Sequence, residues 1–385
     1  MSRASDFKNI AVAPGGLVAI LGGGQLGRMT AMAARTMGYR VRVMDPEAAC
    51  PASFVVDETI GGRWDDVDAA RRLATGADVV TLEIEQIGVD ALEEVARIAP
   101  LRPGVEAIRI IQDKTLQKSW LAENGFPVGP FRVVRSEEEL RDAVPALGGN
   151  VFVKIGRGGY DGRGQARIGP ADGADPGRAW QELGAKPAVA EKALDLECEI
   201  SVMAARSPSG EVRAFPAARN YHENQILAWS VLPAGVPRDL EIAAEALAEA
   251  LVTKLDLVGL LCAEIFVTTD GELFVNELAP RPHNSYHESE RGCVTSQFEQ
   301  LVRAVCNLPL GSTELTTPAA IVNLLGDVWL NSQPNFLAAL RVPGVRLHLY
   351  EKHTPRAGRK MGHLSATGKT AEEALERVLE AKRKL

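Results

Sequence analysis

The sequence predicts an α/β protein, and three stretches carry that prediction. Residues 17–44 alternate an apolar strand, a glycine turn, a helix and a second strand, which is the rhythm of a parallel sheet. Residues 151–165 join an apolar strand to a glycine-rich loop, and residues 259–281 suggest two apolar strands around a tight turn. With 385 residues, the chain is long enough for two or three domains with substantial cores.

Composition narrows the class of protein. Hydrophobic residues make up 46% of the chain and charged residues 24%, which is ordinary for a soluble globular protein. The formal net charge is -7 and no basic block offsets it, which argues against a nucleic-acid partner. The 5 cysteines are scattered, without CxxC or metal-ligand spacing, and no apolar run has the length of a signal or membrane-spanning segment. We therefore expect a cytoplasmic protein without a membrane partner.

The first strand, residues 17–21, leads into a GxGxxG turn at Gly22, Gly24 and Gly27, followed by a helix over residues 26–37. A second strand, residues 39–44, ends at Asp45, an acid at the distance from the turn that a ribose ligand requires. This pattern is a dinucleotide fingerprint. Taken alone, it predicts a nicotinamide-dependent dehydrogenase.

Two acids follow the next predicted strand, residues 78–82. Glu83 and Glu85 stand at its carboxyl end, the edge where ligands of parallel α/β sheets collect. Taken alone, either acid is better explained as a solvated loop residue or a charge at a helix start. The pattern marks this edge as a candidate site without deciding it.

Breakers divide the chain into three parts. A predicted helix from Asp113 closes at Asn124-Gly125, and Pro127 and Pro130 follow. We place a Rossmann-like domain at residues 1–125, a small central domain at 126–195 and a larger domain at 196–385. The last includes a β-rich unit at about 315–370 and a closing helix over 371–384.

The strand at residues 151–153 delivers Lys154 to a loop with the sequence RGGYDGRGQ. A lysine on a rigid strand, followed by glycines that turn their amides outward, suits the phosphates of a nucleotide. Tyr160 and Asp161 at the tip indicate a second substrate. A solvated glycine hairpin has the same composition and is the alternative. Further on, Glu191–Leu194 suits an adenine ring, although a strand end at a hinge gives the same composition.

The most specific inference from spacing concerns Glu264 and Glu277. If Asp270-Gly271 forms a two-residue turn, these acids lie directly opposite each other on one face of a hairpin. Like charges set opposite each other destabilise a sheet unless a cation lies between them. The pair therefore predicts a magnesium site, with Asn276 as a neutral oxygen. The alternatives are a bulge that turns one acid to water, or neutralisation of both acids by Arg281.

Hydrogen-bond donors and cations gather after the hairpin. Arg281, His283 and Asn284 follow it immediately, and the carboxyl-terminal region carries Lys352, Arg356, Arg359 and Lys360 near two glycines. Four cations in nine residues suggest an anion clamp, and a solvated surface turn is the equal alternative.

Together these motifs resemble those of the ATP-grasp enzymes. More narrowly, they resemble 5-(carboxyamino)imidazole ribonucleotide synthetase, the ATP-dependent subunit type of phosphoribosylaminoimidazole carboxylase. The resemblance rests on the lysine strand, the loop GGYDGRGQ, the acids in AEIFV and FVNELAPRPHNS, and the terminal GRKMGH. It covers nearly the whole chain, from Gly22 to the GHL at Gly362.

The resemblance implies a three-domain ATP-grasp fold with ATP between the central and carboxyl-terminal domains. It also implies that the glycine turn of the first domain binds the ribonucleotide substrate and not a nicotinamide. The implied reaction is the ATP- and bicarbonate-dependent carboxylation of the exocyclic amine of 5-aminoimidazole ribonucleotide in purine biosynthesis. Magnesium is the implied metal, and the family is commonly dimeric.

The resemblance also implies roles for residues, carried over by position. For ATP the implied residues are Lys114, Lys154, Gly159, Tyr160, Asp161, Gly162, Arg163, Gly164, Gln165, Glu191, Lys192, Ala193, Leu194, Glu199, His222, Asn276 and Glu277. For magnesium they are Glu264 and Glu277. For the ribonucleotide and its reaction they are Gln25, Leu26, Glu85, Tyr160, Asp161, Arg281, His283, Lys352, Arg359 and Lys360.

The chain departs from the family pattern at two places. Tyr286, His287 and Glu288 replace a usual Gly-His-aromatic run, which affects the expected loop shape, and Lys114 replaces a frequent arginine. Three other functions compete with this one. They are the nicotinamide dehydrogenase, another ATP-grasp ligase such as a formate-dependent glycinamide ribonucleotide transformylase, and a non-catalytic nucleotide-binding regulator.

Overall fold

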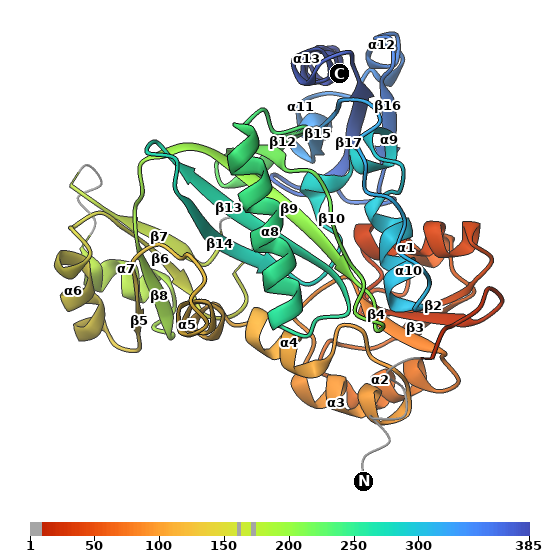
Figure 1. The fold of residues 1–385 in the computed structure, drawn as a ribbon, viewed down its shortest axis with the longest axis horizontal. Coiled ribbons are helices and arrows are strands. Elements are labelled where there is room, and N and C mark those ends of the chain that lie inside the picture. Colours follow the sequence, from red (N-terminus) through yellow and green to blue (C-terminus); the bar gives the residue numbers. More distant parts are fainter. Residues whose placement is uncertain (1–9, 160–162, 171–174) are drawn as a thin grey trace.

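The computed structural model describes residues 10–159, 163–170 and 175–385. The described strands form three sheets, two of four strands and one of nine. In Figure 1 the amino-terminal sheet lies at the lower right, the central sheet at the left, and the large sheet between and above them. The α/β class predicted from the sequence is confirmed.

The amino-terminal sheet is parallel, in the order β3-β2-β1-β4. Strand β1 is buried along its whole length, as its unbroken apolar sequence predicts. Its strands are β1 (Leu17–Leu21), β2 (Arg40–Asp45), β3 (Glu58–Gly61) and β4 (Val79–Leu82). Its helices are α1 (Gln25–Thr36), η2 (Pro51–Phe54), α2 (Val67–Ala74), α3 (Val89–Ile98) and α4 (Val105–Ile111).

Helix α5 (Lys114–Glu123) follows this domain and begins at Asp113, whose side chain accepts the amides of Thr115 and Leu116. Leu121 on α5 is fully buried in the core of the large sheet. Although the sequence assigned residues up to 125 to the first domain, α5 therefore packs against the third.

The central sheet is antiparallel, in the order β5-β8-β6-β7. Its elements are β5 (Phe131–Val134), α6 (Glu137–Ala146), β6 (Val151–Ile155), β7 (Gln165–Ile168), α7 (Pro176–Glu182) and β8 (Ala188–Lys192). Helix α7 was not predicted, because a loop rich in Gly, Pro and Asp precedes it. Its start follows the usual chemistry: Asp175 caps the helix and Pro176 is its first residue.

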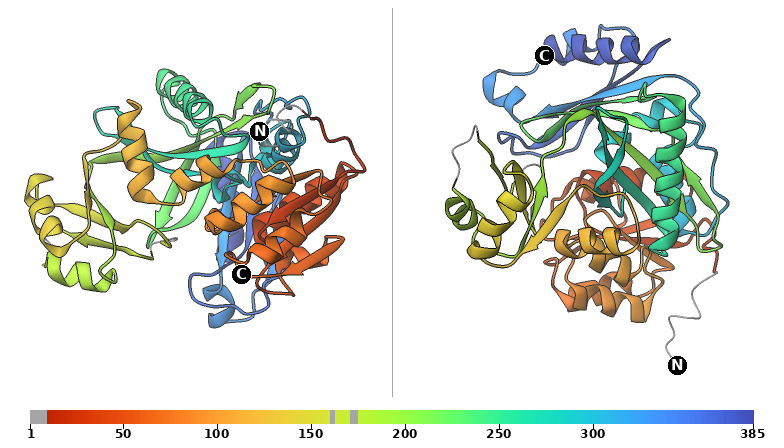
Figure 2. Two further views of the ribbon diagram at one scale, coloured as in Figure 1. Left: turned by 90° about the horizontal axis from the view of Figure 1, so that it is seen from below. Right: turned by 60° about the vertical axis from the view of Figure 1, so that its left-hand side comes forward.

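The large sheet runs β14-β13-β9-β11-β12-β15-β17-β16, with β10 paired to β9. Its first part comprises β9 (Leu196–Arg206), β10 (Val212–Ala214), β11 (Ala218–Glu223), β12 (Ile226–Leu232), α8 (Arg238–Lys254), β13 (Gly259–Thr268) and β14 (Leu273–Ala279). Helix α8 lies across one face of these strands, as Figures 1 and 2 show. The other face packs against α10 and the amino-terminal domain.

The predicted β-rich unit continues this sheet, because β12 pairs with β15. The remaining elements are η3 (Asn284–Tyr286), α9 (Ser289–Gly292), α10 (Gln297–Val305), β15 (Ala319–Leu325), α11 (Asp327–Asn331), α12 (Phe336–Ala339), β16 (Arg346–Leu349), β17 (Lys360–Thr367) and α13 (Ala371–Arg383). Figure 2 shows α13 covering the end of the sheet.

Two further features bear on the class of protein. None of the described helices combines the length and the apolar character needed to cross a membrane. All five cysteines are free thiols.

Candidate active site

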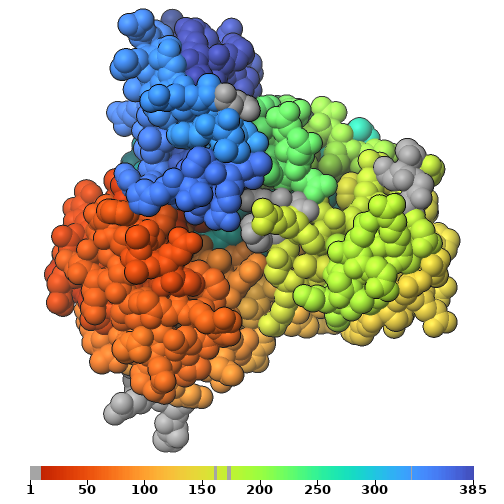
Figure 3. All heavy atoms as spheres, turned by 180° about the vertical axis from the view of Figure 1, so that it is seen from behind, coloured from red at the N-terminus to blue at the C-terminus, as the bar shows by residue number. Residues whose placement is uncertain are grey.

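The three units surround a hollow, which Figure 3 shows between the amino-terminal domain, the central sheet and the carboxyl-terminal strands. The predicted site residues come from all three units. The acids come from β13 and β14, Lys114 from α5 and Lys154 from β6. The residues predicted for the ribonucleotide come from α1, the end of β4 and the segments after β14 and β16.

Glu264 on β13 and Glu277 on β14 are directly paired, as predicted. The predicted route to this pairing was wrong. Thr268 and Glu272 close a three-residue loop, whereas the sequence predicts a two-residue turn. In addition, Asn276 is an extra residue in a bulge between Glu277 and Val275. The extra loop residue and the extra bulge residue shift the strand register in opposite directions, so Glu264 and Glu277 still lie opposite each other. A bulge re-aims a side chain, and Asn276 donates to the Glu264 carboxylate over 3.4 Å.

Two protein cations hold the acid pair. Lys114 Nζ forms an ion pair with Glu277, and His283 Nε2 lies 3.2 Å from Glu264 Oε1. Burial alone would raise the pKa of Glu264, but its contacts with His283 outweigh that cost and lower it. The predicted alternative, in which Arg281 neutralises both acids, is wrong because Arg281 pairs elsewhere.

Lys154 on β6 lies within a buried group of charges. Its Nζ is 2.6 Å from Glu191 Oε2 and 2.9 Å from Asn276 Oδ1, so it reaches across to β14. Lys118 Nζ lies 2.6 Å from the other oxygen of Glu191. Burial raises the pKa of Glu191, yet the charges of Lys154 and Lys118 prevail and lower it to about 2.

Sequence reasoning missed Lys118. The signal was available, because residues four apart on a helix share a face and Lys114 was already a candidate. Lys118 is 6% exposed, and burial lowers its pKa. It also donates to the carbonyl of Val275 over 3.2 Å, which ties α5 to β14.

Two backbone amides of the segment predicted to face adenine already donate hydrogen bonds within the protein. The amide of Lys192 donates to the carbonyl of Pro130, and that of Ala193 to Asn150, each over 2.9 Å. These two amides are therefore not free donors for a base. Leu194 lies beside Gly129, where an added Cβ would come within 3.2 Å of the leucine side chain.

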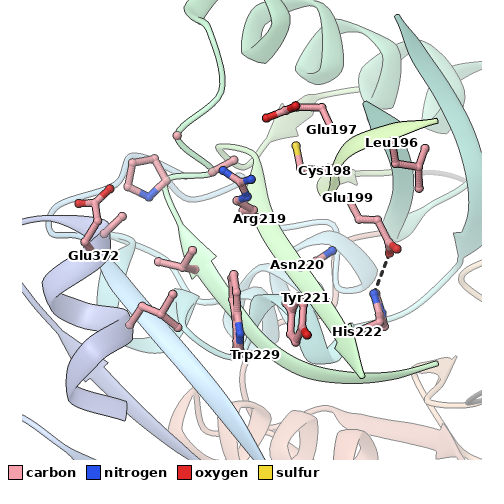
Figure 4. Close-up of a pocket in the computed structure, with 16 residues that line it drawn as sticks. Leu196, Glu197, Cys198, Glu199, Arg219, Asn220, Tyr221, His222, Trp229 and Glu372 are labelled. Atoms are coloured by element: carbon pink, nitrogen blue, oxygen red, sulfur yellow. Dashed lines mark ion pairs between the residues drawn. The ribbon is translucent and has the colours of Figure 1, made fainter. Parts of the chain in front are cut away.

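Glu199 and His222 form a pair 2.7 Å apart at the edge of a groove of about 470 Å³, shown in Figure 4. Burial opposes the charge on His222, but the contact with Glu199 raises its pKa overall. Tyr221 and Trp229 are stacked in the same groove, with ring centroids 5.3 Å apart.

The next residues are those predicted to bind the ribonucleotide, and Glu85 follows β4. Glu85 holds Arg281 with distances of 2.5 and 3.2 Å from its two oxygens, a bidentate contact between the amino-terminal domain and the segment after β14. Burial raises the pKa of Glu85, but Arg281 lowers it below its ordinary value. The sequence predicted both residues for this site without predicting their contact.

A second set of contacts joins α1 to the carboxyl-terminal region. Gln25, the first residue of α1, donates to Asn284 Oδ1 over 2.6 Å and accepts from Lys352 Nζ over 2.7 Å. Lys352 also donates to the carbonyl of Lys360 over 2.8 Å. Arg359 Nη1 donates to the carbonyl of Thr354 over 2.8 Å.

Leu26, in contrast, is buried against Tyr350 and Phe298 in a small core cluster. Its side chain is 5% exposed. The structure therefore places it as a packing residue that fixes α1.

The amino-terminal glycine turn is filled by protein carboxylates. Glu83 accepts the amides of Gly24 and Gly27 over 2.7 and 2.8 Å, and Asp45 accepts that of Gly23 over 2.9 Å. A Cβ at Gly22 would lie 2.3 Å from the Glu83 side chain. Because these amides already bind carboxylates, the dinucleotide interpretation of the turn and of Asp45 is wrong.

The glycine loop after β6 is described at its two ends. Gly158 and Gly164 have φ values of +84° and +73°, which favour glycine. Tyr160, Asp161 and Gly162 lie outside the described residues, so their predicted roles remain predictions. At the base of the loop, Arg157 Nε lies 3.0 Å from Asp113 Oδ2.

The departure at Tyr286–Glu288 forms part of the core behind the site. Tyr286 is fully buried, packs edge-on against Phe215 and donates to the carbonyl of Ser201 over 2.8 Å. Glu288 Oε1 accepts from Ser230 over 2.9 Å. Tyr286 and Glu288 therefore form part of the packing beneath the loop that holds His283.

Three family models match the chain: the ribonucleotide synthetase preATP-grasp domain at residues 16–112, the ATP-grasp domain at 119–298, and the phosphoribosylaminoimidazole carboxylase C-terminal domain at 319–377. The N5-carboxyaminoimidazole ribonucleotide synthase of Brucella melitensis is 43% identical over 352 residues, covering 91% of this chain and 96% of that protein. The chain belongs to the N5-carboxyaminoimidazole ribonucleotide synthase family. The family member from Bacillus subtilis is 41% identical over 367 residues, 95% of each chain.

Solved structures of N5-carboxyaminoimidazole ribonucleotide synthases agree with this assignment. An ADP complex matches with a TM-score of 0.90 at 40% identity, covering 97% of this chain and 98% of that one. The enzyme of Aspergillus clavatus, in complex with ADP and 5-aminoimidazole ribonucleotide, matches with a TM-score of 0.87 at 32% identity, covering 98% and 100%. The ATP-grasp fold predicted from the sequence is confirmed.

Proposed function

We propose that this protein carboxylates the exocyclic amine of 5-aminoimidazole ribonucleotide, using ATP and bicarbonate, to give 5-(carboxyamino)imidazole ribonucleotide, ADP and phosphate. The observation that carries the proposal is the convergence of two half-sites. Lysines and paired acids on β6, α5, β13 and β14 suit a nucleotide triphosphate. The Glu85–Arg281 pair and the Gln25–Lys352 contact form a second polar surface, which suits a ribonucleotide.

The acid pair fits magnesium as the metal that accompanies ATP. Glu264 and Glu277 present carboxylates from facing strands, which are ligands that Mg²⁺ accepts. Asn276 turns its amide nitrogen to Glu264, while its oxygen accepts from Lys154. Lys114 and His283 now supply the compensating charge. Bound Mg²⁺ would supply further charge neutralisation for the phosphates, and Lys114 would then be available to them.

The chemistry requires a better electrophile than bicarbonate. A bicarbonate oxygen attacks the γ-phosphorus of ATP, the bond to the bridging oxygen breaks, and ADP leaves with carboxyphosphate formed. Lys154 and Lys114 would stabilise charge on the transferring group. The substrate amine then attacks the carboxyl carbon of carboxyphosphate, or attacks carbon dioxide released from carboxyphosphate. The carbon–nitrogen bond forms, phosphate leaves, and the amine loses a proton.

We assign orientation or deprotonation of that amine to Asp161, from the sequence alone. Replacing Asp161 with Asn should reduce carboxylation far more than nucleotide binding, because only the acid accepts a proton. Equal loss of ADP affinity and of carboxylation would remove this role from Asp161.

The direct test measures ADP and phosphate release with ATP, Mg²⁺ and a panel of amine acceptors, each with and without bicarbonate. We expect turnover that requires both 5-aminoimidazole ribonucleotide and bicarbonate. Turnover with glycinamide ribonucleotide and formate would instead support the other ligase. An absorbance change with added nicotinamide cofactor would support a dehydrogenase, and binding of ATP without turnover would support a regulator.

We also propose a homodimer in the cytoplasm, with small molecules as its substrates. The five free cysteines suit a reducing compartment. Sedimentation of the purified chain tests the dimer, and a monomer at assay concentrations would exclude it as the active form.

A further inference from the structure

A group of metal-ligand side chains lies on the carboxyl-terminal strands, apart from Glu264 and Glu277. His348 on β16 is directly opposite His363 on β17 in an antiparallel pair. Opposite residues on such strands have Cβ atoms about 5 Å apart, so their side chains share one face. Glu290 on α9 adds a carboxylate, and one ligand atom from each of the three side chains lies within 4.8 Å of the other two.

His363 has one ring nitrogen without a hydrogen bond. The residue is fully buried, and its Nδ1 lies 2.7 Å from the hydroxyl of Tyr350. Its buried Nε2 has no hydrogen-bond partner among the described residues. If Nδ1 carries the proton and donates to Tyr350, Nε2 presents a lone pair. This is the arrangement of a metal-binding histidine, whose second nitrogen donates to an oxygen.

We propose that Glu290, His348 and His363 bind one divalent transition-metal ion such as Zn²⁺. Two imidazoles and one carboxylate form a three-ligand set that leaves a fourth position for water. Imidazole favours zinc, cobalt or nickel over magnesium, which prefers oxygen ligands. The site therefore selects a different class of ion from the acid pair on β13 and β14.

The protonation states of the two histidines favour an ion. Burial lowers the pKa of His348 and of His363, so both are neutral near pH 7 and can coordinate without releasing a proton. Burial also raises the pKa of Glu290 to about 7, and a bound cation would favour its carboxylate form. Arg346 and Arg291 lower the pKa of His348, and their charge limits the affinity for a cation.

Binding requires one ring to turn. The rings of His348 and His363 are stacked, with centroids 4.4 Å apart and planes at 10°. Because imidazole lone pairs lie in the ring plane, both rings cannot point at one ion in this arrangement. His363 is held by Tyr350 and by His287 stacked on its other face, 4.6 Å away. The side chain of His348 is 30% exposed and is therefore the ring that turns.

An ion at this site would join three elements, β16, β17 and α9, and should raise the thermal unfolding midpoint. The site would also lie close to a residue predicted to bind the ribonucleotide. Tyr350 contacts His363, and Lys352 Nζ lies 5.5 Å from the ring of Tyr350.

The test titrates Co²⁺ into the full-length protein with Mg²⁺ in excess. We expect one Co²⁺ per chain, a strong visible absorption of tetrahedral cobalt, displacement by Zn²⁺ and a higher unfolding midpoint. His348→Asn and Glu290→Gln should each weaken binding at least about tenfold. Both side chains are partly exposed, at 30%, so these variants keep the fold.

Two control variants locate the ion. His353→Asn removes an exposed histidine outside the cluster, and Glu277→Gln removes an acid of the candidate active site. Both should bind Co²⁺ as the unmodified protein does. Absence of 1:1 binding would overturn the proposal. So would binding that Glu277→Gln abolishes and His348→Asn leaves intact.

Discussion

Two pairs of acids, one beside the glycine turn and one within the β13–β14 hairpin, differ in the groups that they contact. Asp45 and Glu83 accept hydrogen bonds from backbone amides of the glycine turn, which cannot leave. Glu264 and Glu277 face His283 and Lys114, whose side chains can exchange for another cation. The difference teaches that an acid pair is structural when its partner is backbone, and available for a ligand when its partner is a mobile side chain.

The largest expected effect concerns Glu191, an acid that two buried lysines hold in place. Glu191→Ala leaves Lys118 and Lys154 without their partner and should lower the free energy of unfolding by about 3–5 kcal/mol. Denaturant unfolding measures this loss. A change no larger than that of Glu182→Gln, at an exposed ion pair, would mean that the lysines find other partners.

Glu191 also predicts a pH dependence. Its folded pKa of about 2 lies below the ordinary glutamate value of 4.5, so its stabilisation is present above about pH 4.5 and is lost as pH falls towards 2. The unfolding free energy of the unmodified protein should fall over that window, and that of Glu191→Gln should fall less. Parallel curves for the two proteins would contradict the assignment.

The exchangeable pair is tested at Glu277. Glu277→Gln should reduce ADP release by about 100-fold or more, because one ligand for the cation at the phosphates is lost. Its unfolding midpoint should stay nearly unchanged, since the Glu277 side chain is 40% exposed. An active variant with full Mg²⁺ dependence would break the comparison.

The fixed pair is tested at Glu83. Glu83→Gln replaces one of two accepting oxygens with a donor facing backbone amides, and should cost about 1–3 kcal/mol of stability. Glu93→Gln at the surface serves as the control and should change little. If Glu83→Gln unfolds like the control, the turn does not depend on this carboxylate.

The smallest effect is expected for Arg281→Lys. Lysine keeps the charge but loses the two-point contact with Glu85, so KM for the ribonucleotide should rise by roughly tenfold with a smaller change in kcat. Steady-state kinetics separates the two constants. A fall in kcat alone would indicate that Arg281 acts on the phosphoryl transfer.

Sequence reasoning found much of the candidate site because several signals are local. Lys154 lies on a strand that its apolar neighbours predict. The hairpin that brings Glu264 opposite Glu277 was also predicted, although its loop length and the bulge at Asn276 were not. The spacing from Lys114 could have marked Lys118 as a candidate, but its contact with Glu191, a residue far along the chain, could not be predicted. The partners of Arg281 and Lys352 were missed for the same reason.

The sequence by itself determined the alternation of strands and helices, the lysine strand, the hairpin that carries Glu264 and Glu277, and the likeness to ATP-grasp enzymes, because each depends on a pattern within a short segment. Only the tertiary structure decided what occupies the glycine turn. The motif supplies amides, but whether a phosphate or Glu83 meets them depends on a strand that packs beside the turn. Contacts between segments far apart in the sequence produce no recognisable spacing pattern, so only the folded structure reveals them.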